Sequence, residues 1–345
     1  MMRAPQLLLC AAALIFGVSA SVATAQEPLA APAAPSTKQG PARGPRTRPA
    51  DKPFELHALT PEFWKIFDKE AKLATLASGF GFTEGPVWDP AGFVWASDEE
   101  NNKIVKVYDD GHTEDMVSLV DPDGSTYDKQ HRLLSTASGL RAIIRLSADG
   151  KSFETVVDHY QGKKMNTPND IVIGPDGAIY FTDPIIDMTP EQKQDQELPP
   201  SVYRLGPDNK LTLLTAELKA PNGLAFSPNG KYLYINDDDK KNIRRYRFKN
   251  GTITEGMDFG DMKDPVNRGV PDGMKVDKSG HIFVSGPGGF WIWNSKGVHI
   301  GSVQMPHGMA NLTWGGPDDS KLYITAGNTI YMLPTKTRGI LGYLK

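Results

Sequence analysis

Short runs of alternating hydrophobic and polar residues recur along most of the chain, separated by turns rich in Gly, Pro, Asp and Asn. Runs such as "KIVKVY", "SVYRL" and "IRRYRF" have a period near two, which is typical of strands with one face in a core. The tetrapeptides "DPAG", "GPDG", "SPNG" and "DKSG" stand between pairs of such runs and are typical of β-hairpins. The pattern therefore predicts an all-β fold.

An internal repeat organises these strands. Each unit has a polar residue, a small or turn residue, a strand, a turn and a second strand, and successive units are about 45 residues apart. The six units begin "EGPVWDPAGFVWASD", "DGSTYDKQHRLLSTA", "NDIVIGPDGAIYFTD", "NGLAFSPNGKYLYIND", "DGMKVDKSGHIFVSG" and "NLTWGGPDDSKLYITA". With about four strands per unit, the repeat predicts a six-bladed β-propeller. A pair of β-sandwiches is the alternative, but sandwiches do not require a recurring unit.

The ring is expected to close through a strand near "KLATLA" or "GFGF", which would join the C-terminal sheet around "TIYML" and "ILGYLK". Before that strand, "LTPEFWKIFDKEAKLATL" predicts a short N-terminal helix with Thr60 as N-cap and Pro61 at its first position. Phe63, Ile66 and Phe67 share one face of this helix, so we expect it to pack on the outside of the domain.

The first 53 residues are predicted to lie outside the propeller. Residues 1–25 contain Arg3, an apolar run of about 12 residues that is too short to span a bilayer, and "ATA", which together predict a secretory signal peptide. Residues 26–53 are rich in Pro and Ala and predict a disordered tether. The domain would then span residues 54–345 and lie in the periplasm, without a membrane span. Cys10, the single cysteine, falls inside the signal peptide.

Composition and charge are those of an ordinary globular protein. The 345 residues are 39% hydrophobic and 23% charged, with a formal net charge of −3. Nucleic-acid binding would call for a basic stripe, which this balance does not favour. The sequence leaves open whether a protein partner exists.

The first polar position of the six repeats carries a side-chain oxygen every time: Glu84, Asp123, Asn169, Asn222, Asp272 and Asn311. Asn and Asp before Gly are common turn formers, but this explanation fails for Glu84 and for Asn169. Equivalent positions of propeller blades converge on the central axis, where facing carboxylates would repel one another unless they met a cation. An all-oxygen set suits Ca²⁺, with Mg²⁺, Mn²⁺ or Zn²⁺ left open.

Several motifs resemble one known family in order and spacing: "TEGPVW", "NTPNDIVIGPDGAIYFTDP", "PNGLAFSPNGKYLYIND" and "GVPDGMKVDKSGHIFVSG". The chain resembles the gluconolactonase, senescence-marker-protein and luciferin-regenerating-enzyme family from about Leu59 to Leu333. The resemblance implies a six-bladed propeller with one divalent metal in its channel and hydrolysis of a small lactone. It also implies Glu84, Asn222 and Asp272 as metal ligands, and Asn169 as a residue that contacts the metal directly or through water.

The chain departs from the family pattern where the substrate would bind. "STASG" stands where many bacterial members have a Glu-His pair, Lys164 stands where many have arginine, and Asp123 replaces the usual Asn. Candidate substrate contacts are Asp123, Lys164, Asn166, His307 and Asn311. Asp98, Asp183 and Asp237, which end the second strand of three repeats, are interpreted as local structural caps, and "DDDKKN" (237–242) as a solvated hairpin tip.

Hydrolysis of a lactone needs a polarised carbonyl and a deprotonated water, and a divalent cation can supply both effects. Asp272 is the candidate catalytic residue, because a carboxylate beside metal and substrate can accept a proton and return it to the leaving oxygen. The chain has no G-x-S-x-G, H-E-x-x-H or Walker motif. The main hypothesis is a metal-dependent sugar lactonase. The alternatives are a non-catalytic propeller that binds a sugar or protein, and a related aryl-lactone or ester hydrolase.

Overall fold

The computed structural model describes Met1 and residues 51–342, and says nothing of the side chain of Glu255. The predicted signal peptide and all but the last three residues of the predicted tether lie outside this described part. Among the described residues, no helix is both long enough and apolar enough to cross a membrane.

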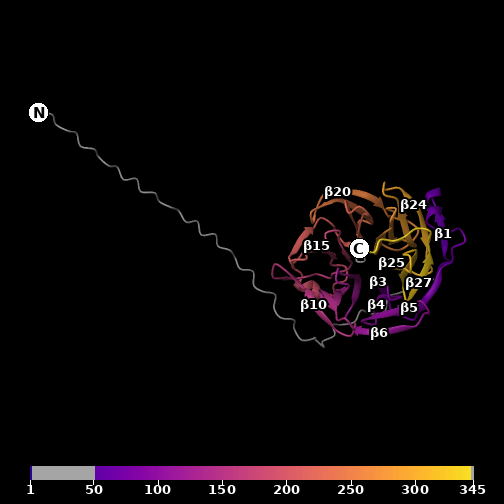
Figure 1. Ribbon diagram of the computed structural model, residues 1–345, viewed down its shortest axis with the longest axis horizontal. Helices are drawn as coiled ribbons and strands as arrows, with labels where there is room; N and C mark the ends of the chain where they lie inside the picture. The colour runs from indigo at the N-terminus through magenta and orange to yellow at the C-terminus, as the bar shows by residue number, and fades with distance from the viewer. Residues whose placement is uncertain (2–50, 343–345) are drawn as a thin grey trace. The chain divides into compact units, whose positions relative to one another are not determined.

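Six antiparallel sheets account for nearly all the described strands, and their order follows the chain (Figure 1). The first three blades are β3 (Thr83–Asp89), β4 (Phe93–Asp98), β5 (Lys103–Tyr108) and β6 (Thr113–Ser118); β7 (Pro122–Tyr127), β8 (Leu133–Ala137), β9 (Ala142–Leu146) and β10 (Phe153–Val157); and β13 (Ile171–Ile173), β14 (Ile179–Asp183), β15 (Ser201–Leu205) and β16 (Leu211–Thr215).

The last three blades include the two N-terminal strands. They are β17 (Pro221–Phe226), β18 (Tyr232–Asp237), β19 (Asn242–Lys249) and β20 (Thr252–Asp261); β21 (Met274–Val276), β22 (Ile282–Gly286), β23 (Gly289–Trp293), β24 (His299–Gln304) and β1 (Glu55–Ala58); and β25 (Met309–Gly315), β26 (Lys321–Ala326), β27 (Thr329–Pro334) and β2 (Ala74–Ser78). Three short helices, η1 (Pro61–Lys65), η2 (Ser138–Leu140) and η3 (Gln192–Asp195), and a small ribbon of β11 (His159–Tyr160) and β12 (Lys163–Lys164) complete the described part.

The first strand of each sheet lies on the inside of a closed ring. Contacts run from β3 to β7, β13, β17, β21 and β25, and from β25 back to β3. In Figure 1, β25 and β3 accordingly lie side by side although they come from opposite ends of the fold. This closed order confirms the predicted six-bladed β-propeller and rules out a pair of sandwiches.

The ring is closed where a strand from the N-terminal segment pairs with the C-terminal sheet. β2 pairs with β27 through Thr75 opposite Tyr331 and Ala77 opposite Ile330, so the last blade takes its outer strand from the N-terminal segment. The prediction from "KLATLA" is thereby confirmed. β1 adds a fifth strand to the preceding blade by pairing with β24, an addition that the sequence pattern did not indicate.

The predicted N-terminal helix is much reduced. Residues Pro61–Lys65 form a single 3-10 turn, and Thr60 makes no side-chain cap. The physical reason is tertiary: the main-chain amides of Leu59 and Thr60 donate to the carbonyl of Ile300, which holds the segment against blade five. Phe63, Ile66 and Phe67 are fully buried, as the shared face predicted.

The C-terminal segment covers one end of the channel. The amide of Ile340 donates to the carbonyl of Val276, at the end of β21, and Gly342 packs near Ile173 at the end of β13. These contacts lie at the C-terminal ends of the inner strands. The N-terminal ends of the same strands, which carry the repeated polar position, therefore lie around the other end.

Candidate functional site

Register irregularities lie beside three of the repeated polar residues, Glu84, Asp123 and Asn222, at the starts of their inner strands. The pairing register shifts between Glu84 and Val87 in β3, between Pro122 and Ser125 in β7, and between Pro221 and Leu224 in β17. A bulge of this kind turns a side chain out of the regular alternation of a strand. The bulges therefore stand where Glu84, Asp123 and Asn222 leave the regular packing between blades, and these three residues line a common cavity.

The glycines that follow four of these residues have a packing role. A Cβ atom on Gly85 would lie within 3.0 Å of the Asp123 carbonyl, and one on Gly223 would be equally close to the Asp272 carbonyl. The same holds for Gly124 against Asn169 and Gly273 against Asn311. Each glycine thus lets one blade approach the polar residue of the next. Glycine is therefore needed at these four positions because neighbouring blades approach closely around the axis, and not because the pairs form turns.

Five of the six repeated residues line one cavity of about 300 Å³ at this end of the channel. Its lining residues are Phe82, Glu84, Glu99, Asp123, Asn169, Ile186, Asp187, Asn222, Asp238 and Asp272. All four residues expected to hold a metal, and the expected catalytic residue among them, are therefore brought together. Every ionisable group in this lining is a carboxyl.

The cavity carboxyls of Glu84, Asp123 and Asp272 have raised pKa values. Burial, followed by the charge of Asp170, raises the pKa of Glu84 to about 7. Burial and then the charges of Glu99 and Glu84 raise the pKa of Asp123, and burial with the charge of Glu84 raises that of Asp272. A concentrated set of buried negative charges is unfavourable until protons or cations compensate it.

Three buried oxygens on the cavity wall have no hydrogen-bond partner, one each on Glu84, Asn222 and Asp238. Glu84 accepts a bond from the amide of Gly85 through Oε2, while its Oε1 has none, and Glu84 is only 2% exposed. Asn222 is 3% exposed, and its Oδ1 is likewise unpartnered. Unpartnered buried oxygens are costly in a folded protein unless a ligand meets them. This donor set, of carboxylate and amide oxygens, fits a hard divalent cation.

Carboxylates alone do not make a metal site here. Within residues 51–342, no group of three or more acidic, histidine or cysteine side chains converges closely enough to hold a metal ion. A cation in this cavity would therefore need amide oxygens beside the carboxylates, which matches a set of two carboxylates and two asparagines.

Asn311 occupies the sixth position of the ring but does not line the cavity. It is 1% exposed, and its Oδ1 accepts bonds from Lys275 Nζ at 3.1 Å and from the Leu312 amide at 2.9 Å. Lys275 and Asp170 lie close enough to Glu84 to shift its pKa. Asn311 thus belongs to a polar layer beneath the cavity.

Besides Asn311, three further predicted substrate contacts are not brought to the cavity. Lys164 pairs with Asp158 at 3.2 Å, and His307 pairs with Asp51 at 3.1 Å. Asn166 is fully buried, and its side-chain Nδ2 donates to the main-chain carbonyl of Asp183. Of the five proposed contacts, only Asp123 lines the cavity.

The sequence interpretation missed three lining carboxylates: Glu99, Asp187 and Asp238. Glu99 and Asp238 each directly follow a strand-ending aspartate, Asp98 and Asp237. Because the second strand of a blade runs antiparallel to the first, its end lies beside the start of the inner strand, and this position could have been predicted. Asp238 is therefore not part of a solvated hairpin tip, as the run "DDDKKN" suggested, but faces the channel.

The strand-ending aspartates do have the structural role that was predicted. Asp98 accepts the amide of Gly81 at 2.9 Å, Asp183 accepts that of Asn166 at 3.0 Å, and Asp237 accepts that of Lys219 at 2.8 Å. Each carboxylate thus fastens the segment that leads into its own blade.

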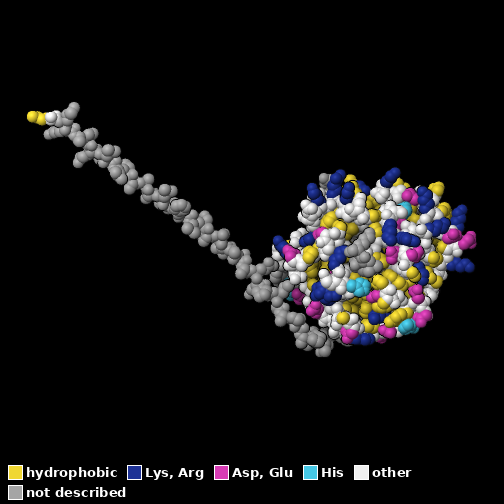
Figure 2. All heavy atoms as spheres, in the orientation of Figure 1, with side chains coloured by type: hydrophobic (Ala, Val, Ile, Leu, Met, Phe, Trp, Pro, Cys, Tyr) yellow, Lys and Arg dark blue, Asp and Glu magenta, His cyan; other side chains and the backbone are white. Residues whose placement is uncertain are grey.

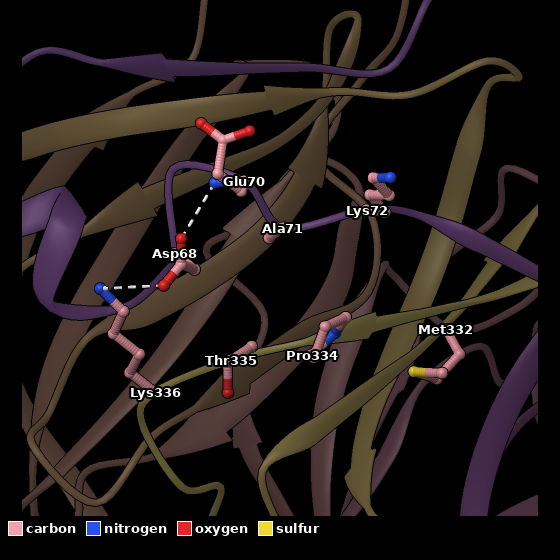
Figure 3. A pocket seen from close by; sticks show the side chains of 8 residues that line it. All are labelled: Asp68, Glu70, Ala71, Lys72, Met332, Pro334, Thr335 and Lys336. Carbon is pink, nitrogen blue, oxygen red and sulfur yellow. Dashed lines mark hydrogen bonds and ion pairs between the residues drawn. The ribbon is translucent and has the colours of Figure 1, made fainter.

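A second hollow lies on the outer edge, near the ring closure (Figure 3). It is a shallow groove lined by Asp68, Glu70, Lys72, Met332, Lys336 and their neighbours. Two of its charged groups pair with each other: Asp68 lies 4.0 Å from Lys336 Nζ, and Asp68 also accepts the main-chain amide of Glu70 at 3.0 Å. Over the rest of the visible face, acidic and basic side chains both occur (Figure 2). The central cavity remains the chemically organised site.

Comparison with known proteins shows which sequences and folds this chain resembles. Residues 82–328 match the family described as the SMP-30/Gluconolactonase/LRE-like region. A gluconolactonase of Zymomonas mobilis is 31% identical, with 95% of this chain and 96% of that protein covered. The solved structure of a Xanthomonas campestris gluconolactonase superposes with a TM-score of 0.76 and 30% identity, over 85% of this chain and 99% of that one.

A more distant structure shares the fold. The calcium-binding protein regucalcin of Agrobacterium tumefaciens superposes with a TM-score of 0.65 at 19% identity, covering 85% of this chain and 98% of that one.

Proposed function

The chain belongs to the SMP-30/gluconolactonase/LRE-like family, and from this premise we propose that it is a metal-dependent lactonase that opens sugar lactones in the central cavity. The observation that carries the proposal is the pair of buried, unpartnered oxygens, Glu84 Oε1 and Asn222 Oδ1, in a wall shared with Asp272. The name of the 31% identical relative, a gluconolactonase, supports a sugar lactone as substrate.

Glu84, Asn169, Asn222 and Asp272 would hold the cation. We propose Ca²⁺, because carboxylate and amide oxygens are its usual protein ligands, and the regucalcin of the same fold is a calcium-binding protein. Mg²⁺, Mn²⁺ and Zn²⁺ are the ions to compare with it. When bound, such a cation supplies positive charge that stabilises the oxyanion formed at the lactone carbonyl and lowers the pKa of a neighbouring water.

Asp272 is the residue proposed to move the proton. Water adds to the lactone carbonyl carbon and gives a proton to the Asp272 carboxylate; the ring C–O bond then breaks, and the same proton passes to the departing oxygen. Burial and the charge of Glu84 raise the pKa of Asp272 above its ordinary value, which is the direction that suits a carboxyl that both accepts and returns a proton. The product is the open hydroxy acid.

The activity is tested with a panel of lactones in a pH-indicator assay, because each opened lactone releases one proton at neutral pH. We expect hydrolysis of neutral aldonolactones such as glucono-1,5-lactone above the spontaneous rate. Aryl lactones and simple esters in the same panel test the related hydrolase alternative. If the cation stabilises the fold but no lactone or ester is opened, the protein is a non-catalytic binding propeller and the proposal is wrong.

Asp272→Asn separates the proton-transfer role from the fold. The variant keeps side-chain size and loses the ability to carry a proton, so we expect kcat to fall by roughly 10²–10⁴-fold with an unchanged circular dichroism spectrum. Asp239→Asn, an exposed change in the neighbouring blade, is the control and is expected to be fully active. Full activity of Asp272→Asn would remove Asp272 from the mechanism.

Export to the periplasm is also proposed, from residues 1–25 alone. Mass spectrometry of the mature N-terminus is the check, with cleavage after Ala25 expected.

A further inference from the structure

An asparagine can hold a cation only through its side-chain oxygen, since the amide nitrogen carries two hydrogens and no lone pair for a metal. Two of the four proposed ligands, Asn169 and Asn222, are asparagines. Their usefulness therefore depends on which end of each amide faces the cavity. Groups around the two amides decide this orientation.

Asn222 is oriented by one carboxylate. Its Nδ2 donates to Asp238 Oδ2 at 3.4 Å, and its Oδ1 is left without a protein partner. Asp238 lies directly after β18, at the same end of the blade as the start of β17. The main chain of the same strand is fixed as well, because the Gly223 amide donates to Asn236 Oδ1 at 3.0 Å. The orientation of the Asn222 amide is thus left to Asp238.

Asn169 is oriented by two carboxylates. Its Nδ2 donates to Asp123 Oδ2 at 2.7 Å and lies 3.3 Å from Asp187 Oδ2. The main chain is held in place from both sides, since the Asn169 amide donates to the Thr182 carbonyl and the Asn169 carbonyl accepts the Gly124 amide. The arrangement seen within one blade at Asn222 thus recurs at Asn169, where one of the two carboxylates, Asp123, comes from the preceding blade.

We infer that Asp238 is a positioning residue for the metal site: it holds the Asn222 amide so that Oδ1 faces the cation, as Asp123 and Asp187 do for Asn169. This inference rests on the proposed metal site. Asp238 Oδ2 accepts a hydrogen bond from the Asn222 amide nitrogen, so it holds the nitrogen end of the amide and leaves the oxygen end turned away. Groups behind metal ligands commonly change affinity by 10–100-fold when they are removed.

The role explains why so many carboxylates surround one site. Three or more acidic side chains do not converge on a single point among residues 51–342, so Asp123, Asp187 and Asp238 do not build a further metal site among themselves. Each instead lies against the nitrogen of a ligand amide. The extra carboxylates are placed to orient ligands.

The test is calorimetric titration of the chelator-treated protein with Ca²⁺. We expect Asp238→Asn to bind Ca²⁺ about 10–100-fold more weakly than the unchanged protein, because the new side chain can offer either an acceptor or a donor to Asn222. Asp239→Asn removes the same charge one residue away at an exposed position, and we expect its affinity to stay within about twofold. Thermal unfolding in chelator checks that both variants are folded.

Loss of one negative charge near a cation would also weaken binding, and a double-mutant cycle separates this effect from orientation. In an Asn222→Asp background, position 222 presents oxygen whichever way it turns, so orientation no longer matters. We expect Asp238→Asn to cause little or no weakening in that background. Equal weakening in both backgrounds would assign the effect to charge and overturn the inference.

A second pair keeps the inference testable if Asp238→Asn does not fold. Asp187→Asn is then measured with and without Asn169→Asp, with the same expected pattern. Unchanged Ca²⁺ affinity in both Asp→Asn variants overturns the positioning role but leaves the metal site standing. Absence of binding by the unchanged protein, with Ca²⁺, Mg²⁺, Mn²⁺ or Zn²⁺, overturns the metal site and this inference with it.

Discussion

Glu84 is a carboxylate that the fold buries, although removing its charge from water costs free energy. Its side chain is 2% exposed, and burial is the largest cause of its raised pKa. A buried carboxylate of this kind destabilises the fold unless its charge is compensated. The charge of Lys275 partly compensates it from the layer below, where Lys275 donates a hydrogen bond to Asn311.

Glu84→Gln should therefore separate function from stability. The isosteric amide removes a ligand charge, so we expect Ca²⁺ affinity and lactone turnover to fall at least about 100-fold, a loss larger than that for groups behind the ligands. The chelator-treated variant should unfold at the same temperature as the unchanged protein or higher, because a buried charge is gone. A clear loss of metal-free stability would show that Glu84 is chiefly a structural residue.

The predicted residues that line the cavity share one property: each occupies the same position in its repeat, a position that Asn311 also holds without lining the cavity. Glu84, Asp123, Asn169, Asn222 and Asp272 were found in this way, and all line the cavity. Lys164 and His307 stand near a motif in the chain, yet their side chains lie against Asp158 and Asp51, away from the cavity. Nearness along the chain does not fix the direction of a side chain in a loop.

At the scale of elements, strands were predictable and the N-terminal helix was not. The period of two and the hairpin turns depend on local chemistry. The 3-10 turn of η1 depends on main-chain bonds to Ile300, far away in the sequence. The bulges in the inner strands also escaped prediction, because they arise from close approach between neighbouring blades at residues such as Gly85 and Gly223.

His281 links the N-terminal segment to blade five and predicts a pH dependence. Burial opposes its protonation, but hydrogen bonds to Asp277 at 2.7 Å and Glu62 at 3.3 Å leave its pKa raised above 6.5. The folded state then binds the proton more tightly than the unfolded state, so the stabilisation is complete below about pH 6.5 and is lost as pH rises through the folded pKa.

His281→Gln should accordingly cost more stability at pH 5.5 than at pH 8.5, with an acid-side loss of roughly 1–3 kcal/mol from hydrogen bonds to charged groups. Urea denaturation across this pH range measures it. His299→Gln is the matched comparison, since burial lowers the pKa of His299, and its effect should change with pH in the opposite sense. A pH-independent cost of His281→Gln would contradict the assigned pairing.

At the scale of the whole molecule, ring closure creates a site that no single blade contains. The expected ligands come from the starts of four different inner strands, and a fifth blade adds Asp123. The repeat and the resemblance to a known family predicted this convergence. The repeat does not specify the addition of β1 to blade five. It also does not specify that the carboxylates after the second strands face the cavity, because both features depend on tertiary pairing.

The charge of the cavity predicts selectivity among lactones. All its ionisable lining groups are carboxyls, and repulsion disfavours a ligand of like charge in a shielded cavity. We expect kcat/KM for glucono-1,5-lactone to exceed that for its 6-phosphorylated form by at least about tenfold. Asp187→Asn should reduce this ratio, whereas Asp239→Asn, at an exposed position, should leave it unchanged. A preference for the phosphorylated lactone would contradict this view of the cavity.

The central claim is that oxygens converging from several blades hold one cation, on which lactone opening depends. The most direct test is the rate of glucono-1,5-lactone hydrolysis by protein stripped with a chelator, with elemental analysis to confirm removal, followed by titration with Ca²⁺. The account predicts a fall to the spontaneous rate and recovery that saturates at one cation per chain. Full activity in protein that contains no metal would contradict it.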